Sequence, residues 1–154
     1  IGTCLLEGTN VSEGRGTTKP FEILGAPWIN AYELSDAMNR KGLSGVIFRP
    51  AYFIPSFSKH QGQLCGGVQI HITDRKSVKA FEIGVKLIYT LMDLYKDSFA
   101  FLPPNQEGSQ FFFDHLAGTD EIRLRSRDFK SMMDHFAKDI HIFSELKEKY
   151  HLYG

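Results

Sequence analysis

Two long segments have apolar residues at helical spacing, and they constrain the fold more than any other feature of the sequence. The first spans residues 77–95 and the second spans residues 128–150. A stripe with this period is typical of an amphipathic helix that packs one face on the core. We therefore expect two helices with inward-facing stripes, the first of them capped by Ser77. The stripe of the first helix is Phe81, Val85, Ile88, Met92 and Tyr95. The stripe of the second helix is Phe129, Met132, Phe136, Ile140, Phe143 and Leu146.

Strand patterns are fewer and shorter than the helical ones. Residues 68–73 alternate between apolar and polar side chains, which predicts a strand with one face on the core. Residues 45–67 are aromatic and extended, but their prolines cannot donate to a sheet ladder, so we expect an edge strand or an extended crossing segment. The apolar run at residues 2–6 predicts a short strand that is buried on both faces.

Several shorter helices are also predicted. Asn30 followed by Glu33 is a capping-box pattern, which marks the start of a helix. Residues 20–28 predict a single helical turn, and residues 109–117 predict a short aromatic helix before a glycine. Few strands and several helices without a regular βαβ alternation favour an α+β fold. We expect one domain over residues 1–154, with a small mixed or antiparallel sheet of three to four strands covered by several helices.

Composition excludes some classes of partner. The 154 residues carry 18 basic and 18 acidic side chains, so bulk charge does not favour a surface for nucleic acid or anionic lipid. No apolar run approaches the roughly 20 residues that a membrane-spanning helix needs. Two cysteines, Cys4 and Cys65, are too few for a disulfide framework, and buried thiols are favoured over a single bridge.

Familiar catalytic and cofactor motifs are missing. The nearest match to a phosphate loop has its glycines, Gly8 and Gly14, one residue too far apart and lacks the lysine. None of the six histidines lies in an HExxH motif or a Cys/His framework, and the chain has no GxSxG motif. We therefore predict no cofactor and no metal. A metal-dependent hydrolase would need at least three histidines or acids to converge.

The segment at residues 7–17, with the sequence EGTNVSEGRGT, is the strongest candidate for a ligand site. Glu7 is expected at the end of the buried strand, where a carboxylate is costly unless it is paired, and it is the candidate catalytic residue. Arg15 lies between two glycines and offers a fork to a carboxylate. The hydroxyls and the amide suit a sugar and are candidate substrate-binding groups: Asn10, Ser12 and Thr17. The alternative is that Glu7 and Arg15 pair with each other and only fasten the loop.

Three further residues are candidate substrate contacts, each with a plainer alternative. Trp28 could stack on a sugar face, although a single tryptophan more often packs in the core. Arg49 could hold a ligand or neutralise a buried acid. Lys59, in the sequence FSKHQG, either belongs to a solvated loop or supplies a cation that faces the ligand.

The segments CLLEGTNVSEGRGTTKPFEILGAPWI, FRPAYFIPSFSKHQGQLCGGVQIHITD and FFDHLAGTDEIR resemble the NamZ type of exo-β-N-acetylmuramidases, formerly a bacterial domain of unknown function. With the ending FSELKEKYHLYG, the resemblance spans nearly the whole chain. It implies proteins about twice this length, in which an N-terminal Rossmann-like domain joins a smaller C-terminal domain across an active-site cleft. This chain resembles the smaller domain, without the N-terminal domain and the glutamate proposed as catalytic there.

The resemblance implies hydrolysis that releases a terminal, non-reducing β-1,4-linked N-acetylmuramic acid from peptidoglycan fragments. It also implies a secreted, periplasmic or envelope-associated protein. Arg15 would then grip the lactyl carboxylate of the sugar and Asn10 its acetamido group, while Glu7 would supply one of two carboxyl groups. The alternative is a non-catalytic carbohydrate-binding or interdomain docking module. An open concavity around Glu7 and Arg15 would favour the first reading, and a packed surface the second.

Overall fold

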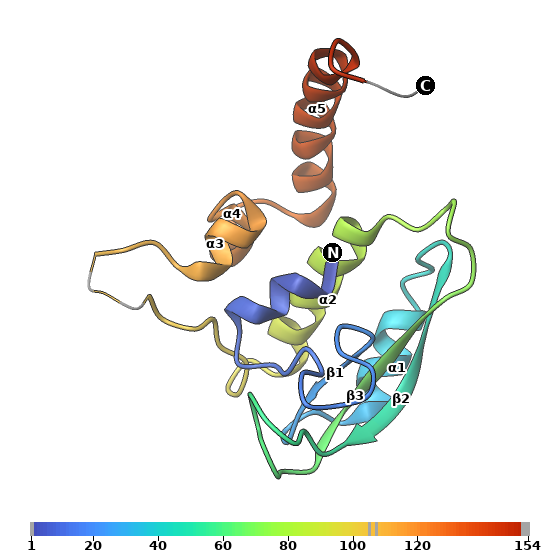
Figure 1. The fold of residues 1–154 in the computed structure, drawn as a ribbon, viewed down its shortest axis with the longest axis vertical. Helices are drawn as coiled ribbons and strands as arrows, with labels where there is room; N and C mark the ends of the chain where they lie inside the picture. The colour runs from blue at the N-terminus through green and yellow to red at the C-terminus, as the bar shows by residue number, and fades with distance from the viewer. Residues whose placement is uncertain (1, 105, 107, 152–154) are drawn as a thin grey trace.

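The computed structural model of the chain describes residues 2–104, 106 and 108–151, and this part has an α+β fold, as predicted (Figure 1). Three strands form one antiparallel sheet in the order β1-β3-β2. Helices cover one side of this sheet in successive layers. The strands are β1 (Ile23–Ala26), β2 (Val46–Phe53) and β3 (Cys65–Ile72). The helices are the 3-10 helix η1 (Gly2–Gly8) and the α-helices α1 (Ala31–Asn39), α2 (Ala80–Leu94), α3 (Phe112–Ala117), α4 (Glu121–Leu124) and α5 (Phe129–Glu148).

The two strands expected from alternation and from the aromatic segment are confirmed. β3 is the central strand, and Val68 on it is fully buried, whereas Ile72 at its end is exposed. β2 is an edge strand, and Phe48 lies opposite Ile70 on the core face. Pro50 therefore lies where a missing backbone donor is tolerated.

The strand predicted for residues 2–6 is wrong, because these residues form η1. A short apolar run fits a buried strand and a buried helix equally well, so its period cannot decide. η1 packs on α2 at very close range: a Cβ on Gly2 would lie 2.0 Å from the carbonyl oxygen of Ala80. A Cβ on Gly84 would lie 2.5 Å from the carbonyl oxygen of Gly2. Leu5 and Leu6 are buried by this contact.

The helical turn predicted for residues 20–28 is also wrong, because Ile23–Ala26 forms β1. Its backbone pairs with β3, where Gly25 lies opposite Gly67. A Cβ on Gly67 would lie 1.9 Å from the carbonyl oxygen of Leu24, so the pairing depends on a glycine that lies far along the chain. A prediction from local sequence does not take this distant pairing partner into account.

The predicted start of α1 is confirmed, with a variation. Asn30 Oδ1 accepts hydrogen bonds from the backbone of Tyr32 and Glu33, as an N-cap should. The Glu33 side chain does not return to Asn30 but accepts from the Tyr95 hydroxyl at 3.0 Å. That hydroxyl also lies 3.2 Å from both the backbone nitrogen and the backbone oxygen of Asn30. Tyr95 thereby links the end of α2 to the start of α1.

Tyr95→Phe is expected to lower the free energy of unfolding by about 1.5 kcal/mol, because the hydroxyl's bond to a carboxylate and to the cap is lost. Burial, followed by the hydrogen bond to Glu33, raises the pKa of Tyr95, so the hydroxyl keeps its proton in the neutral pH range. Urea unfolding measures the change. Tyr32→Phe, at an exposed tyrosine on α1, is the control and should leave stability unchanged. Equal stability of the two variants would contradict this role for Tyr95.

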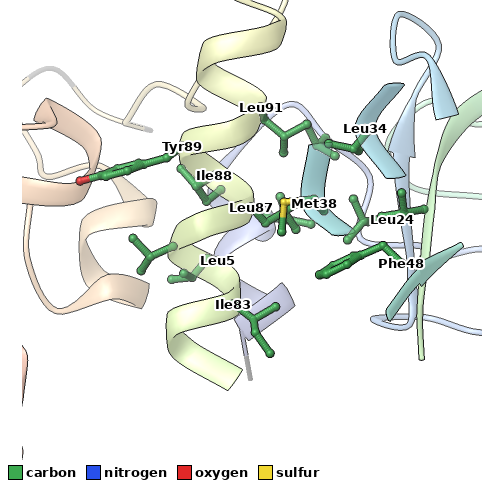
Figure 2. Packing of buried hydrophobic residues seen from close by; sticks show 14 of the residues in the cluster. Leu5, Leu24, Leu34, Met38, Phe48, Ile83, Leu87, Ile88, Tyr89 and Leu91 are labelled. Carbon is green, nitrogen blue, oxygen red and sulfur yellow. The ribbon is translucent and has the colours of Figure 1, made fainter. Parts of the chain in front are cut away.

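α2 is the centre of the core, and it is buried almost all round rather than along one stripe. Figure 2 shows Leu5 and Tyr89 on one side of α2, and Met38 and Phe48 on the other. A helix that is apolar all round lies inside its domain. α2 begins at Ala80 rather than near Ser77, whose hydroxyl donates to the carbonyl of Asp74 instead.

α5 begins as predicted, with Asp128 accepting a hydrogen bond from the backbone of Ser131. Its inward stripe is confirmed only at the start, where Met132 is buried and Phe136 packs edge-on against Phe81. The later stripe residues Ile140, Phe143 and Leu146 are exposed. α5 projects beyond the rest of the fold, so its second half has no layer to pack on (Figure 1).

Candidate functional site

Two loops that are far apart in sequence form the candidate site. One is the glycine loop (residues 7–17), and the other is the β2–β3 loop (residues 54–64). The carbonyl of Gly16 accepts hydrogen bonds from both the backbone nitrogen and the hydroxyl of Ser56, at 2.8 and 2.9 Å. Gly16 has a φ of +80°, and a Cβ there would lie 2.6 Å from the Phe57 carbonyl oxygen. The close contact of the two loops therefore requires glycine at this position.

Four charged side chains form an ion-pair chain across the two loops. Arg15 Nη2 lies 3.1 Å from Glu7 Oε2, and Arg15 Nε lies 2.9 Å from Glu13 Oε1. Glu13 Oε2 lies 3.0 Å from Lys59 Nζ. The order Glu7–Arg15–Glu13–Lys59 alternates acid and base, so every charge has an opposite neighbour.

Burial changes steeply along this ion-pair chain. The Glu13 side chain is 3% exposed, the Glu7 side chain 26% and the Arg15 side chain 43%. A buried carboxylate is stable only when it is paired and hydrogen-bonded, and Glu13 has two cations. The buried Glu13 carboxylate thus holds Arg15 in place, while the charged groups of Glu7 and Arg15 are partly exposed to solvent.

Glu13 is the residue of the candidate site that sequence reasoning missed. It lies in the same loop as Glu7, and nothing in the spacing distinguishes the two carboxylates. The expected place of Glu7 at the end of a strand is wrong, because it lies in the last turn of η1. What marks Glu13 is that two cations, Arg15 and Lys59, surround one buried acid. This feature is not visible in the sequence, because Lys59 lies 46 residues from Glu13.

Lys59 holds the glycine loop together. Its Nζ donates toward the carbonyl oxygens of Leu6, Glu7 and Val11, at 2.8, 3.3 and 3.1 Å, and toward Glu13. An ammonium has three N–H groups, so these four oxygens occupy it fully. Burial lowers the pKa of Lys59, and the hydrogen bond that Lys59 donates to Glu13 opposes that shift. The predicted substrate contact of Lys59 thus falls on a side chain already engaged by the protein.

The backbone on either side of Lys59 is unusual. Ser58 and His60 have φ values of +71° and +58°, in the left-handed region that side chains rarely adopt. His60 Nε2 lies 2.7 Å from the carbonyl oxygen of Asn10, which ties this turn to the glycine loop. Such strain persists only where surrounding contacts over-determine the conformation.

Arg15 keeps hydrogen-bonding capacity despite its two acids. Its Nη1 makes no hydrogen bond to any residue that the structure describes, and its Cζ lies 5.0 Å from the centre of the Phe21 ring. Glu13 and Phe21 fix the guanidinium plane, and the outer edge is accessible. A carboxylate ligand would find a guanidinium held in place.

The other predicted polar groups of the glycine loop are engaged within the protein. Asn10 Nδ2 donates to the Ser98 carbonyl at 2.7 Å, and its Oδ1 accepts from the Ala100 backbone at 3.0 Å. Ser12 is buried and accepts from the backbone of Gly14. Thr17 donates to the Gly14 carbonyl at 2.7 Å. These bonds shape the loop, and the predicted sugar contacts of these three residues stay predictions.

Trp28 and Arg49 are not joined to the ion-pair chain by any contact among the described residues. Trp28 is partly buried against the core, and its ring lies 5.4 Å from that of Tyr95. Arg49 is exposed on β2, opposite Gln69, and pairs with no acid in the part of the chain that the structure covers.

Neither metal ligation nor a disulfide arises in the described part of the chain. Among residues 2–104, 106 and 108–151, no three histidine, cysteine, aspartate or glutamate side chains lie close enough to hold a metal ion. Cys4 and Cys65 are both free thiols. Of the helices that the structure describes, none has the length and apolar character to cross a membrane.

Comparison with known proteins identifies the family. The family described as exo-beta-N-acetylmuramidase NamZ, C-terminal, matches residues 1–153. The peptidoglycan beta-N-acetylmuramidase NamZ of Bacillus subtilis (strain 168) is 46% identical over 154 residues, which cover 98% of this chain. The chain spans only 36% of that protein's length, less than the half expected from the sequence.

Solved structures agree with this match. A crystal structure of a DUF1343 family protein from Bacteroides fragilis NCTC 9343 has a TM-score of 0.85 and 33% identity, covering 99% of this chain and 40% of its own. A second DUF1343 family protein from the same bacterium has a TM-score of 0.63 and 27% identity, covering 98% and 38%. The family match over almost every residue and the shared fold lead to one conclusion: the chain belongs to the family of NamZ C-terminal domains.

Proposed function

We propose that this domain forms part of the substrate site of an exo-β-N-acetylmuramidase, which releases terminal N-acetylmuramic acid from peptidoglycan fragments. Its ion-pair chain would lie at the edge of a cleft whose other wall belongs to a preceding domain. The family match and the activity for which the B. subtilis relative is named support the reaction class. The single observation that carries the assignment of residues is the partly exposed Glu7–Arg15 pair beside the buried Glu13.

The chemistry of the pair suits an acidic amino sugar. N-acetylmuramic acid carries a lactyl carboxylate, and the outer edge of Arg15 can donate two parallel hydrogen bonds to it. Glycoside hydrolysis generally needs two carboxyl groups on either side of the scissile bond. Glu7 is the candidate for one of them, and the second would come from outside this chain. A peptidoglycan substrate would be consistent with a secreted, periplasmic or envelope-associated protein, as the resemblance implies.

The alternative function is a docking or carbohydrate-binding module without a catalytic residue. The 3.1 Å pairing of Glu7 with Arg15 favours it, because each charge already has a partner. A ligand carboxylate would then have to compete with Glu7 for Arg15. The two readings differ in whether Arg15 recognises the lactyl group and whether Glu7 is needed for turnover.

Arg15→Ala is expected to weaken binding of N-acetylmuramic acid roughly tenfold and to leave binding of N-acetylglucosamine, which lacks the lactyl carboxylate, nearly unchanged. Calorimetric titration of the protein that contains this domain with both sugars measures the difference. Arg40→Ala, at an exposed arginine just after α1, is the matched control. An equal loss for both sugars would show that Arg15 does not recognise the carboxylate.

A further inference from the structure

A concave surface lies at the other end of the sheet from the ion-pair chain. The register pairs Phe53 with Cys65 beside the β2–β3 loop and Val46 with Ile72 at the opposite end. Near that opposite end, the turn before β2, the turn before α2 and the starts of α2 and α5 enclose a cavity of about 560 Å³. Its polar and charged lining residues are Lys41, Ser44, Lys76, Ser77, Lys79, Glu82 and Lys86.

The lining of this cavity, which we call the basic pocket, has an excess of positive charge. The chain as a whole is neutral, but the pocket lining has four lysines and one acid. Glu82 lies 3.7 Å from Lys79, whose side chain is mostly exposed, so this pair neutralises little. The ammonium groups of Lys41, Lys76 and Lys86 form no ion pair with any described residue, although the Asp74 carboxylate accepts a hydrogen bond from the backbone nitrogen of Lys76 at 2.9 Å. The basic side chains of the glycine loop and of α4, by contrast, all have an acid beside them.

Lys86 has an aromatic partner rather than a carboxylate at ion-pair distance. Its Nζ lies 3.4 Å from the centre of the Phe129 ring. Burial lowers the pKa of Lys86, repulsion from Lys41 lowers it further, and attraction to Glu82 opposes these effects. An anion between these two ammonium groups would remove that repulsion.

The start of α2 adds to the positive electrostatic potential of the basic pocket. Its N-cap residue, Lys79, makes no side-chain capping bond, and a helix N-terminus carries partial positive charge with backbone donors that point outward. Ser77 lines the pocket beside this terminus. Lysines act as point charges for phosphate, and helix N-termini bind phosphate through their N–H groups.

We propose that the basic pocket binds an anion with two or more closely spaced phosphate groups, through Lys41, Lys76 and Lys86. The excess of lysines over acids calls for a multivalent anion, and the volume exceeds what a single phosphate needs. The site is independent of the amino-sugar function, because it uses none of the residues of the ion-pair chain. The basic pocket would bind a phosphate-bearing polymer, while the ion-pair chain at the other end of the sheet would bind the sugar.

Titration of the 154-residue chain with inorganic tripolyphosphate tests the site. We expect saturable binding with one site, which weakens as sodium chloride rises because exposed charges are screened. A parallel titration with a synthetic oligo(glycerol phosphate) distinguishes the two sources of this chemistry, a short polyphosphate and a phosphodiester polymer. Saturable binding of either supports the proposal and identifies the source, and binding of neither overturns it.

Charge-reversal variants locate the site. Lys41→Glu and Lys76→Glu should each weaken binding at least about tenfold, because each replaces an attraction with a repulsion. Lys96→Glu, an exposed lysine outside the pocket lining, is the control for general charge. All three positions are exposed, and circular dichroism confirms that each variant is folded. If the control and the pocket variants lose the same affinity, the effect comes from net charge alone and the proposed site is wrong.

Discussion

Glu13→Ala is expected to lower the free energy of unfolding of the chain by about 3 kcal/mol, the scale at which a buried ion pair loses one partner. Glu13 is almost fully buried and is the shared acid of Arg15 and Lys59. Without it, the Lys59 ammonium stays buried with only carbonyl oxygens as partners. Urea unfolding, followed by circular dichroism, measures the loss.

The chain contains a matched control for this prediction. Glu22 also pairs with a lysine, Lys19, at 3.3 Å, but both side chains are about half exposed. Glu22→Ala should therefore change stability by less than about 1 kcal/mol. If Glu13→Ala and Glu22→Ala have the same small cost, Glu13 does not anchor the two loops and the ion-pair chain is a surface feature.

Glu7→Gln is expected to reduce kcat for release of N-acetylmuramic acid from a chromogenic muramide by at least about 100-fold, in the protein that contains this domain. Glutamine keeps the shape of the side chain and can still accept a hydrogen bond from Arg15. It cannot take part in proton transfer or carry the negative charge that glycoside hydrolysis needs. Release of the chromophore measures turnover directly.

Glu22→Gln, which removes an exposed carboxylate outside the ion-pair chain, should leave kcat unchanged. Near-normal turnover of a folded Glu7→Gln variant would remove Glu7 from catalysis and favour the docking function. Sugar binding tests the role of Arg15 separately, because recognition of the lactyl group would not depend on whether Glu7 is catalytic.

Local signals in the sequence predicted the elements that local contacts determine. The Asn30 cap, the alternation of β3 and the start of α5 at Asp128 all depend on residues within one turn or one strand. The errors lie where a distant partner decides. Residues 2–6 became η1 because α2 packs against them, and residues 23–26 became β1 because β3 pairs with them.

The candidate site divides in the same way. Glu7 and Arg15 were found because they belong to one loop of unusual composition, and their pairing was foreseen as an alternative. The roles of Glu13 and Lys59 could not be predicted, because they arise only when two loops more than 40 residues apart meet. Lys59 was expected either to be solvated or to face a ligand, and instead its ammonium contacts four oxygens of the protein.

The strained turn around Lys59 has a consequence for affinity. Ser58 and His60 hold left-handed backbone angles, and Lys59 donates to the carbonyls of Leu6, Glu7 and Val11 in and beside the glycine loop. The entropy of ordering both loops is therefore lost when the chain folds, before any sugar arrives. Binding to such a preorganised surface loses little further freedom, so even a small ligand with few contacts can be held with useful affinity.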